Sequence, residues 1–226
     1  MFKFCLAGEY PQDVNRIGGG VAYIVHVLAQ TFAERDDIDF HIISPVKRIK
    51  GISVEKRDRA TIHFVGIPKT KLIPNLLTTG HRISAVFRDV RPDAVNSHHT
   101  TTTDASVRSG IKVLHTVHGI VHNEIAYASG YEKLALMLHS KMQFKSVASA
   151  DVVSSVAQYG LDAYKQWIKN QAVVIPVPIE DVFFDVPTFD NQRNILYAGG
   201  IGPRKTLFAL VQAMKGIVSK YPDVVL

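Results

Sequence analysis

The sequence of 226 residues contains a single cysteine, Cys5, a single tryptophan and no long apolar run. One cysteine excludes an internal disulfide framework, and its place within an apolar stretch predicts a core residue in a reducing compartment. The apolar start at residues 1–7 is interrupted by Lys3 and is too short for a signal peptide, and no later stretch could span a bilayer. We therefore predict a cytoplasmic protein.

Acidic residues are scarce in one segment. Residues 47–91 hold eleven Lys or Arg and only three Asp or Glu, so this basic segment carries the whole excess behind the net charge of +6. Such a segment attracts anions, which include nucleic acid, lipid headgroups and phosphorylated substrates. A solvated surface explains the charge at least as well. Because the segment lacks interleaved aromatic residues, nucleic acid is the least favoured partner.

Apolar runs typical of strands alternate with amphipathic helical segments through most of the chain. Periodic apolar residues predict helices that span residues 20–35, about 75–90, 100–108, 131–148 and 157–168. Short apolar runs predict strands at residues 2–7, 39–44, 93–97, 112–117, 151–155 and 172–175. Pro45 should end the second of these strands. Two further short strands, at 52–55 and 61–65, should flank a charged turn. This alternation predicts an α/β fold with a Rossmann-like, doubly wound parallel sheet.

A polar stretch punctuated by proline, residues 176–192, separates this pattern from a second, shorter one. We place the domain boundary inside it, which gives domains at 1–186 and 187–226. The second begins with strand 194–198 and a helix with an apolar face over 207–218, and ends in strand 224–226. A lone βαβ unit of about 40 residues is too small to fold alone. We therefore expect a truncated second Rossmann-like domain, whose open sheet edge favours a homodimer.

The glycine-rich turn Gly18-Gly19-Gly20 joins the first predicted strand to the first predicted helix. Glycine lets backbone N–H groups approach a ligand closely, and a helix N-terminus carries partial positive charge. The turn is therefore a candidate phosphate site, although a simple tight turn fits the same residues. The spacing is not G-x-G-x-x-G, and the second strand ends at Ser44 without a carboxylate for a ribose, which argues against an NAD enzyme.

Histidines follow two other predicted strand ends, which should share one sheet edge with the glycine turn. They are His98 and His99 after one strand and His118 near the end of the next. Five histidines in this region, 98, 99, 115, 118 and 122, could suggest a metal, but no cysteine lies nearby and no standard ligand spacing appears, so we predict no metal. Most histidines are structural or exposed, and His118 is the favoured functional one because Gly119 follows it directly.

Five motifs in order resemble the retaining glycosyltransferases of family 4, which have the GT-B fold. The resemblance covers the whole chain. The motifs are Gly19-Gly20-Val21, Arg91 to His98, Thr116 to Gly119, Val174 to Pro178 and Ile195 to Lys205.

The resemblance implies transfer of a sugar from a nucleotide-sugar donor to an acceptor with retention of configuration and without a metal or other cofactor. Gly19 and Gly20 match the loop that meets the donor diphosphate. His118 matches the histidine that contacts the donor sugar. Lys205 matches the lysine that neutralises the leaving diphosphate, where negative charge grows in the transition state. The acceptor or cleft candidates are His98, His99, Asn123 and Glu124.

This sequence departs from the family pattern after Gly199, where Gly200 replaces the usual arginine, so Arg204 is the substitute candidate. Thr206 replaces the usual glycine after the lysine. The family's glutamate motif would lie beyond Leu226, and we therefore expect this chain to transfer little sugar alone. The alternatives are an acceptor-binding subunit of a split transferase and a nucleotide-sugar epimerase of related fold.

The resemblance also sharpens the interpretation of the basic segment. Members that act on lipid-linked acceptors carry basic and apolar residues on the first domain, and residues 69–77 combine both. We therefore expect the acceptor to be a sugar or a lipid-linked sugar. Peripheral contact of residues 47–91 with the anionic inner face of a membrane is a hypothesis.

Overall fold

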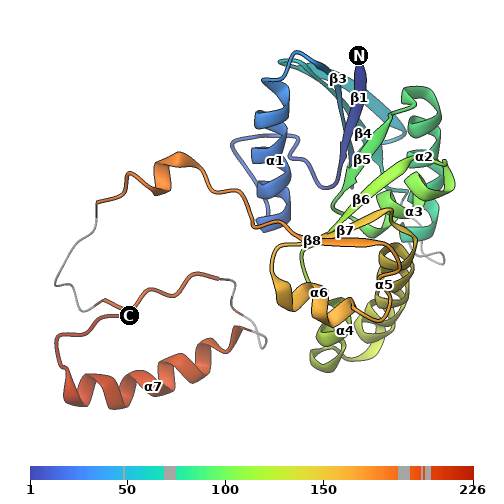
Figure 1. Cartoon of the computed structure of the whole chain (residues 1–226). Helices are drawn as coiled ribbons and strands as arrows, with labels where there is room; N and C mark the ends of the chain where they lie inside the picture. Colours follow the sequence, from blue (N-terminus) through green and yellow to red (C-terminus); the bar gives the residue numbers. More distant parts are fainter. Residues whose placement is uncertain (48, 69–74, 188–193, 200, 202–204) are drawn as a thin grey trace.

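The computed structural model describes residues 1–47, 49–68, 75–187, 194–199, 201 and 205–226. It contains a mixed α/β arrangement built on one eight-stranded sheet (Figure 1). The strands are β1 (Phe2–Ala7), β2 (Ile38–Val46), β3 (Ile52–Arg57), β4 (Ala60–Gly66), β5 (Ala94–Ser97), β6 (Lys112–Val117), β7 (Val152–Ser155) and β8 (Gln171–Val174). The α-helices are α1 (Gly20–Ala33), α2 (Asn75–Val90), α3 (Thr100–Arg108), α4 (Val121–Glu124), α5 (Gly130–Ser149), α6 (Gln158–Tyr164) and α7 (Leu207–Lys220), and the 3-10 helices are η1 (Ile125–Tyr127) and η2 (Asp181–Phe183).

The sheet has the order β3-β4-β2-β1-β5-β6-β7-β8. Every pair of neighbours is parallel except the β3–β4 hairpin at one edge. The predicted α/β fold with a doubly wound parallel sheet is therefore confirmed, with one antiparallel edge strand. The second strand was predicted to stop before Pro45, which was wrong: β2 continues to Val46, and Pro45 pairs in register with Val65. A proline carbonyl can still accept a ladder hydrogen bond although its nitrogen cannot donate one.

Two apolar layers cover the sheet. On one face, α2, α3, α5 and α6 contribute to a core that includes the buried Cys5, as predicted, together with Phe87 and Tyr164. On the other face, α1 packs on β1, β2 and β4 and buries Phe40, Ile42 and Phe64. In the described part of the chain, α1 is the only helix on that face (Figure 1). The reason is that α1 connects β1 to β2, toward the β3 edge of the sheet, whereas the other helices that connect strands lead toward the β8 edge.

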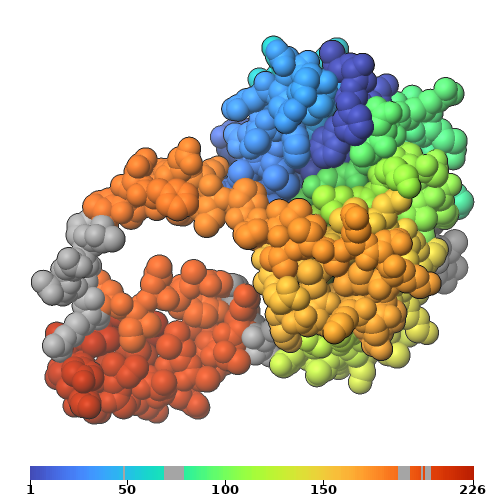
Figure 2. Space-filling view, in the orientation of Figure 1, coloured from blue at the N-terminus to red at the C-terminus, as the bar shows by residue number. Residues whose placement is uncertain are grey.

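The segment after β8 leaves along the outer surface beside α1 (Figure 2). Ile175 and Pro178 of this segment line a small hollow together with Ile24 and Leu28 of α1. The chain then reaches α7, which buries Met214 but leaves Phe208 80% exposed. The domain boundary that we placed at residue 186 stays a prediction.

The strands predicted at 194–198 and 224–226 are absent. A single parallel bridge joins Asn194 to Val225 instead, with the Ile195 amide donating to the Val225 carbonyl at 2.8 Å. Among the described residues, no third strand pairs with these two short segments. One bridge does not make a sheet that buries a face, so extended propensity alone does not produce strands here. The homodimer expected through this edge stays a prediction.

Candidate functional site

The candidate site lies where the sheet changes direction. Strand order runs from β1 to β2 on one side and from β5 to β6 on the other, so the connections that leave β1 and β5 diverge to opposite faces. In open α/β sheets, ligands bind in the crevice outside the carboxyl ends of such strands. The glycine turn follows β1, His98 follows β5 and His118 follows β6, which confirms that the three predicted features share this edge.

The glycine turn has the backbone that its sequence predicts. Gly19 is the N-cap of α1 with φ 147° and ψ 162°, a conformation that side chains other than glycine rarely adopt. Its carbonyl accepts the first helical hydrogen bond, from the Tyr23 amide at 3.0 Å. A Cβ placed on Gly18, Gly19 or Gly20 would meet nothing within 4 Å, so the turn presents bare backbone to solvent.

The connection from β1 to the glycine turn is held in place by one side chain of β2 and one of β3. Ser44 Oγ accepts a hydrogen bond from the Tyr10 amide at 2.9 Å and donates to the Tyr10 carbonyl at 3.2 Å. Arg57 donates to the carbonyls of Pro11 and Gln12 at 3.2 and 2.7 Å. The loop therefore enters the turn from a fixed position.

Beside this loop lies a hollow of about 350 Å³ that we call the basic pocket. Its lining includes Glu9, Arg16, Gly18, Pro45, Lys47 and Ile67. Its two cations, Arg16 and Lys47, outnumber its one carboxylate, Glu9, so this part of the edge has a net positive charge. Gly19 and Gly20 line none of the described hollows.

His98 and His118 form a pair across the crevice. The Nδ1 atom of His98 lies 2.7 Å from Nε2 of His118, and the rings stack with centroids 4.9 Å apart and an interplanar angle of 22°. The other two ring nitrogens, Nε2 of His98 and Nδ1 of His118, are buried and have no hydrogen-bond partner among the described residues. The pair therefore offers two unsatisfied polar atoms at the edge where a ligand would lie.

Burial keeps both rings neutral. Desolvation, followed by the neighbouring charges of His118 and His115, lowers the pKa of His98 to about 3. Desolvation lowers the pKa of His118 to about 4. At neutral pH each imidazole carries one N–H and one bare nitrogen, so the pair can exchange hydrogen bonds with hydroxyl groups without carrying charge.

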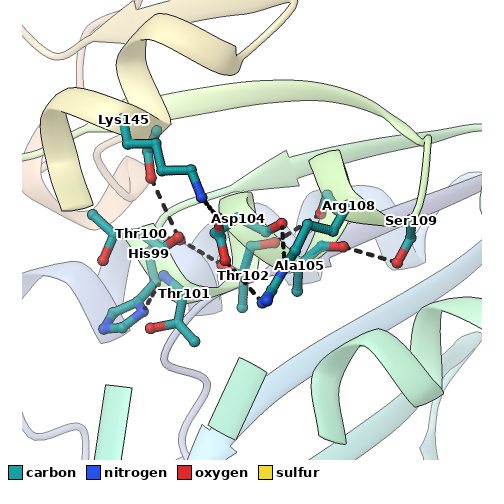
Figure 3. A network of polar contacts seen from close by, with 11 residues as sticks. His99, Thr100, Thr101, Thr102, Asp104, Ala105, Arg108, Ser109 and Lys145 are labelled. Carbon is teal, nitrogen blue, oxygen red and sulfur yellow. Dashed lines mark hydrogen bonds and ion pairs between the residues drawn. The ribbon is translucent and has the colours of Figure 1, made fainter. Parts of the chain in front are cut away.

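His99, by contrast, has a structural role at the start of α3. Its Nδ1 accepts a hydrogen bond from the Thr101 amide at 3.2 Å, which caps the helix (Figure 3). Its ring stacks on His139 of α5, with centroids 6.3 Å apart. His115 contacts α3, where its Nδ1 lies 2.8 Å from Thr103 Oγ1.

The start of α3 is tied to α5 by polar contacts. Asp104 lies 2.7 Å from Lys145 and 2.8 Å from Arg108 (Figure 3). Ser146 Oγ donates to the Thr100 carbonyl at 3.3 Å. These contacts hold the β5–α3 connection, and with it His98, against the rest of the edge.

The loop that carries His118 is anchored by α5 and α6. The Gly119 carbonyl accepts hydrogen bonds from Gln143 Nε2 at 3.2 Å and from the Tyr164 hydroxyl at 3.4 Å. The Val121 amide donates to Gln143 Oε1 and the Tyr164 hydroxyl at 3.4 and 3.3 Å, and Tyr164 also donates to Gln143 Oε1. The backbone after His118 is therefore fixed from both sides.

Three hollows meet at His118. One of about 190 Å³, the histidine pocket, is lined by Glu9, His98, His99, His118 and His139 among others. The second is the small hollow beside α1. The third, of about 390 Å³, we call the tyrosine pocket, and its lining includes His118, Asn123, Glu124, Tyr127, Tyr159 and Gly160.

The structure thus gathers most of the predicted site residues. His98, His99 and His118 line the histidine pocket, and Asn123 and Glu124 join His118 in the tyrosine pocket. Lys205 is exposed and lies outside these hollows, close to Gly199, whose Cβ would stand 3.8 Å from Lys205 Cδ. Arg204 lies outside the described residues, as do Lys69 and Lys71 of the basic segment.

Several residues of the site were not predicted from the sequence. Glu9 lines three hollows, and Tyr127 and Tyr159 line the tyrosine pocket. Glu9 comes two residues after β1 and Tyr159 four residues after β7, so their position just beyond a predicted strand end was the available signal. Gln143 and Tyr164 lie within helices and carried no such signal.

Among the described residues, no group of three or more His, Cys, Asp or Glu is arranged to hold a metal ion. In the same part of the chain, no helix is long and apolar enough to cross a membrane.

A family model described as Glycosyltransferase Family 4 matches residues 18–182. No curated protein sequence matches the chain.

Similar solved structures share the fold at low identity. The chain resembles sucrose-phosphate synthase from Thermosynechococcus elongatus with TM-score 0.61 and 13% identity, covering 100% of this chain and 70% of that one. It also resembles the UDP-N-acetylglucosamine 2-epimerases from Rickettsia bellii (TM-score 0.55, 9% identity, 100% of this chain and 61% of that one) and Methanocaldococcus jannaschii (0.52, 12%, 99% and 64%). The chain therefore spans about two thirds of the length of these relatives.

Proposed function

Because this chain belongs to glycosyltransferase family 4, we propose that it transfers a sugar from a nucleotide-sugar donor to an acceptor with retention of configuration. The bond between the anomeric carbon and the diphosphate oxygen breaks, and the acceptor oxygen takes its place on the same face of the sugar. The acceptor proton leaves with the diphosphate, and no metal or other cofactor is required. The donor sugar, the base and the acceptor are identified by the experiment below.

One observation carries the proposal: a neutral histidine pair stands next to an exposed glycine turn at the direction change of the sheet. Bare backbone at Gly19 and Gly20 suits the diphosphate, because the N–H groups at the start of α1 point outward with partial positive charge. His118 offers an unpartnered Nδ1 atom for a hydroxyl of the donor sugar. Since both histidines are neutral, they bind hydroxyls without competing for the diphosphate.

Positive charge for the leaving diphosphate would come from Lys205 and Arg204. Lys205 is exposed and therefore available to a ligand. As the anomeric bond breaks, negative charge grows on the diphosphate, and a nearby cation lowers the energy of that state more than that of the bound donor. This is how the reaction would proceed without a metal.

The test measures release of nucleoside diphosphate from a panel of nucleotide sugars, with and without acceptor sugars, and the anomeric configuration of any product by NMR. We expect release that depends on acceptor, with the configuration retained. His118→Ala and Lys205→Ala should each lower the rate by about a hundredfold. The matched controls are His81→Ala and Lys215→Ala, which remove exposed residues outside the site. An inverted product would exclude the retaining mechanism.

The same experiment separates two alternatives. Interconversion of the donor sugar without any acceptor would identify an epimerase, the activity named for two structures that share the fold. Binding of acceptor without binding of any nucleotide sugar would identify an acceptor-binding subunit. The family match over residues 18–182 favours transfer over both.

Acceptors linked to a lipid would require contact with a membrane, and the basic segment at residues 47–91 is the proposed contact surface. Flotation with liposomes tests this directly. We expect recovery with anionic liposomes to exceed recovery with neutral ones, and equal recovery would remove the membrane from the proposal.

A further inference from the structure

We propose that the tyrosine pocket binds an uncharged sugar ring, and that this ring is the part of the acceptor next to the transferred sugar. The identification of this ring as part of the acceptor rests on the proposed function. The binding itself depends only on the pocket. It predicts which class of acceptor the protein takes: a neutral carbohydrate unit and not a sugar phosphate.

The pocket has the size and position for this ligand. Its volume of about 390 Å³ falls within the range of roughly 300–1,000 Å³ that small-molecule sites occupy. It lies outside the carboxyl ends of β6 and β7, and it shares His118 and Gly119 with the histidine pocket. A ring bound here would therefore lie beside the place proposed for the donor sugar.

The wall of the pocket is suited to the face of a sugar. Much of its lining is apolar, contributed by Val117, Ile120, Val156 and Ala157. Two tyrosines stand at its rim, and Tyr127 and Tyr159 are 64% and 69% exposed. The C–H face of a pyranose is apolar and its edge is polar, and a tyrosine ring with a hydroxyl at its tip matches both.

Polar groups of the pocket are placed for hydroxyls. The Asn123 side chain donates to the Tyr159 hydroxyl at 3.4 Å, a long bond that a ligand hydroxyl could replace or extend. Glu124 adds a carboxylate, which accepts hydrogen bonds from hydroxyl groups, and His118 adds an imidazole. Directional partners of this kind fix the orientation of a ligand within an otherwise apolar site.

Charge excludes a phosphorylated ring from this pocket. The described lining contains no Lys or Arg, and its one carboxylate, Glu124, would repel a phosphate. The cations of the edge, Arg16 and Lys47, line the basic pocket instead. The net charge of the lining is therefore positive in the basic pocket and not in the tyrosine pocket. The tyrosine pocket suits a ligand without a phosphate.

The backbone on the β7 side is shaped by a glycine. A Cβ on Gly160 would stand 2.1 Å from Ser155 Oγ, so glycine allows α6 to approach the end of β7 closely. Because α6 starts close to the end of β7, it places Tyr159 at the rim of the pocket. The stacking residue is therefore held by a helix and not by a free loop.

The test is binding of sugars to the ¹⁵N-labelled chain, followed by amide NMR in the absence of any nucleotide sugar. The probes are a panel of neutral methyl glycosides and disaccharides and the 6-phosphates of the same sugars. We expect at least one neutral sugar to shift the amides of Gly119, Asn123 and Gly160. Its 6-phosphate should bind about tenfold more weakly or not at all.

Variants of the two tyrosines complete the test. Tyr159→Ala and Tyr127→Ala should each weaken binding about tenfold, while Tyr159→Phe, which keeps the ring, should restore most of it. Tyr131→Ala is the matched control, because Tyr131 is an exposed tyrosine that does not line the pocket. All three positions are exposed, so the four variants should fold.

Three results would overturn the inference: no neutral sugar binds at its highest soluble concentration, the 6-phosphate binds more tightly, or binding is unchanged in both alanine variants. Failure of the proposed function is seen separately. A chain that binds neutral sugars here but releases no nucleoside diphosphate from any donor would keep the pocket and lose the transfer reaction.

Discussion

The Nδ1 atom of His98 and the Nε2 atom of His118 are 2.7 Å apart, although the two residues follow different strands of the sheet. A neutral imidazole has one N–H and one bare nitrogen, so only one ring of the pair donates in this bond. The tautomer of each ring is therefore tied to that of the other. If His98 donates, His118 must carry its proton on Nδ1, its buried atom without a hydrogen-bond partner. If His118 donates, that atom is bare.

This coupling predicts that His98 positions the proton of His118. In His98→Leu, the partner atom is gone and His118 should populate both tautomers, whereas the unmodified chain should show one. Ring ¹⁵N chemical shifts of His118 measure the difference directly. If the proposed transfer holds, its rate should fall about tenfold without a matching change in donor affinity. His81→Leu, at an exposed position outside the site, is the control. An unchanged His118 spectrum in His98→Leu would contradict the prediction.

Acid should destabilise the fold through its buried histidines. Desolvation lowers the pKa of His63, His99, His115 and His118 to about 4 and that of His98 to about 3. An unfolded histidine has a pKa of about 6.5, so between about pH 6.5 and 4 the unfolded chain binds more protons than the folded one.

The contribution of these histidines to the free energy of unfolding should therefore be constant above about pH 7 and fall as the pH is lowered through that window. Each of the five contributes a slope of up to about 1.4 kcal/mol per pH unit. Urea unfolding at a series of pH values measures the curve. In His115→Gln the slope should be smaller. Stability that is the same at pH 7 and pH 5 would show that these rings are not buried as neutral groups.

Tyr164 should be important for the position of the His118 loop, because its hydroxyl belongs to the network that anchors this loop. Its hydroxyl contacts Gln143 Oε1, the Gly119 carbonyl and the Val121 amide, and the residue is fully buried, which raises its pKa to about 12. Tyr164→Phe removes these partners and should cost about 1–3 kcal/mol, because buried polar groups lose their hydrogen bonds. Urea unfolding measures the loss.

The control is Tyr159→Phe, which removes a hydroxyl that is exposed and makes one long hydrogen bond. It should change stability by less than about 0.5 kcal/mol. Equal effects of the two variants would mean that the anchoring network contributes nothing.

The sheet edge could be predicted from the sequence, and the histidine pair could not. Alternating strands and helices imply a parallel sheet, and a parallel sheet brings its carboxyl ends together, so the glycine turn, His98 and His118 were expected at one edge. Which nitrogen meets which depends on register and side-chain direction. The register pairs Ser97 with His115, and no local pattern encodes that alignment.

The strand predictions at Pro45 and at residues 194–198 were wrong, for reasons that also lie in the pairing of strands. Pro45 was expected to close β2, but a proline can remain in a strand where its nitrogen is not needed as a donor. Residues 194–198 have strand composition, yet they form only one bridge, because a strand is stabilised by neighbours and not by its own sequence. Gln143 and Tyr164 were missed since their effect on the site is entirely tertiary.

Gly19 and Gly20 should respond to alanine in opposite directions. Gly19 has φ 147°, where an added Cβ is strained, so Gly19→Ala should lower the free energy of unfolding by about 1–3 kcal/mol. Gly20 starts α1, and a Cβ there would meet nothing within 4 Å. Gly20→Ala should therefore stabilise the chain by up to about 1 kcal/mol, since alanine favours the helix and reduces the entropy of the unfolded state. Urea unfolding of the two variants gives the comparison.

Measurements of nucleotide binding distinguish a role of the glycine turn in ligand binding from a role in the fold alone. If the donor diphosphate lies against the N–H groups at the start of α1, the methyl group of Gly20→Ala occupies the space that the diphosphate needs. Calorimetry with nucleoside diphosphates should then show binding about tenfold weaker in a variant that is more stable. Gain of stability with loss of affinity cannot come from unfolding, so it would assign the open backbone at Gly20 to the ligand. A variant that is stabilised and binds as tightly as before would show instead that the turn serves only the fold.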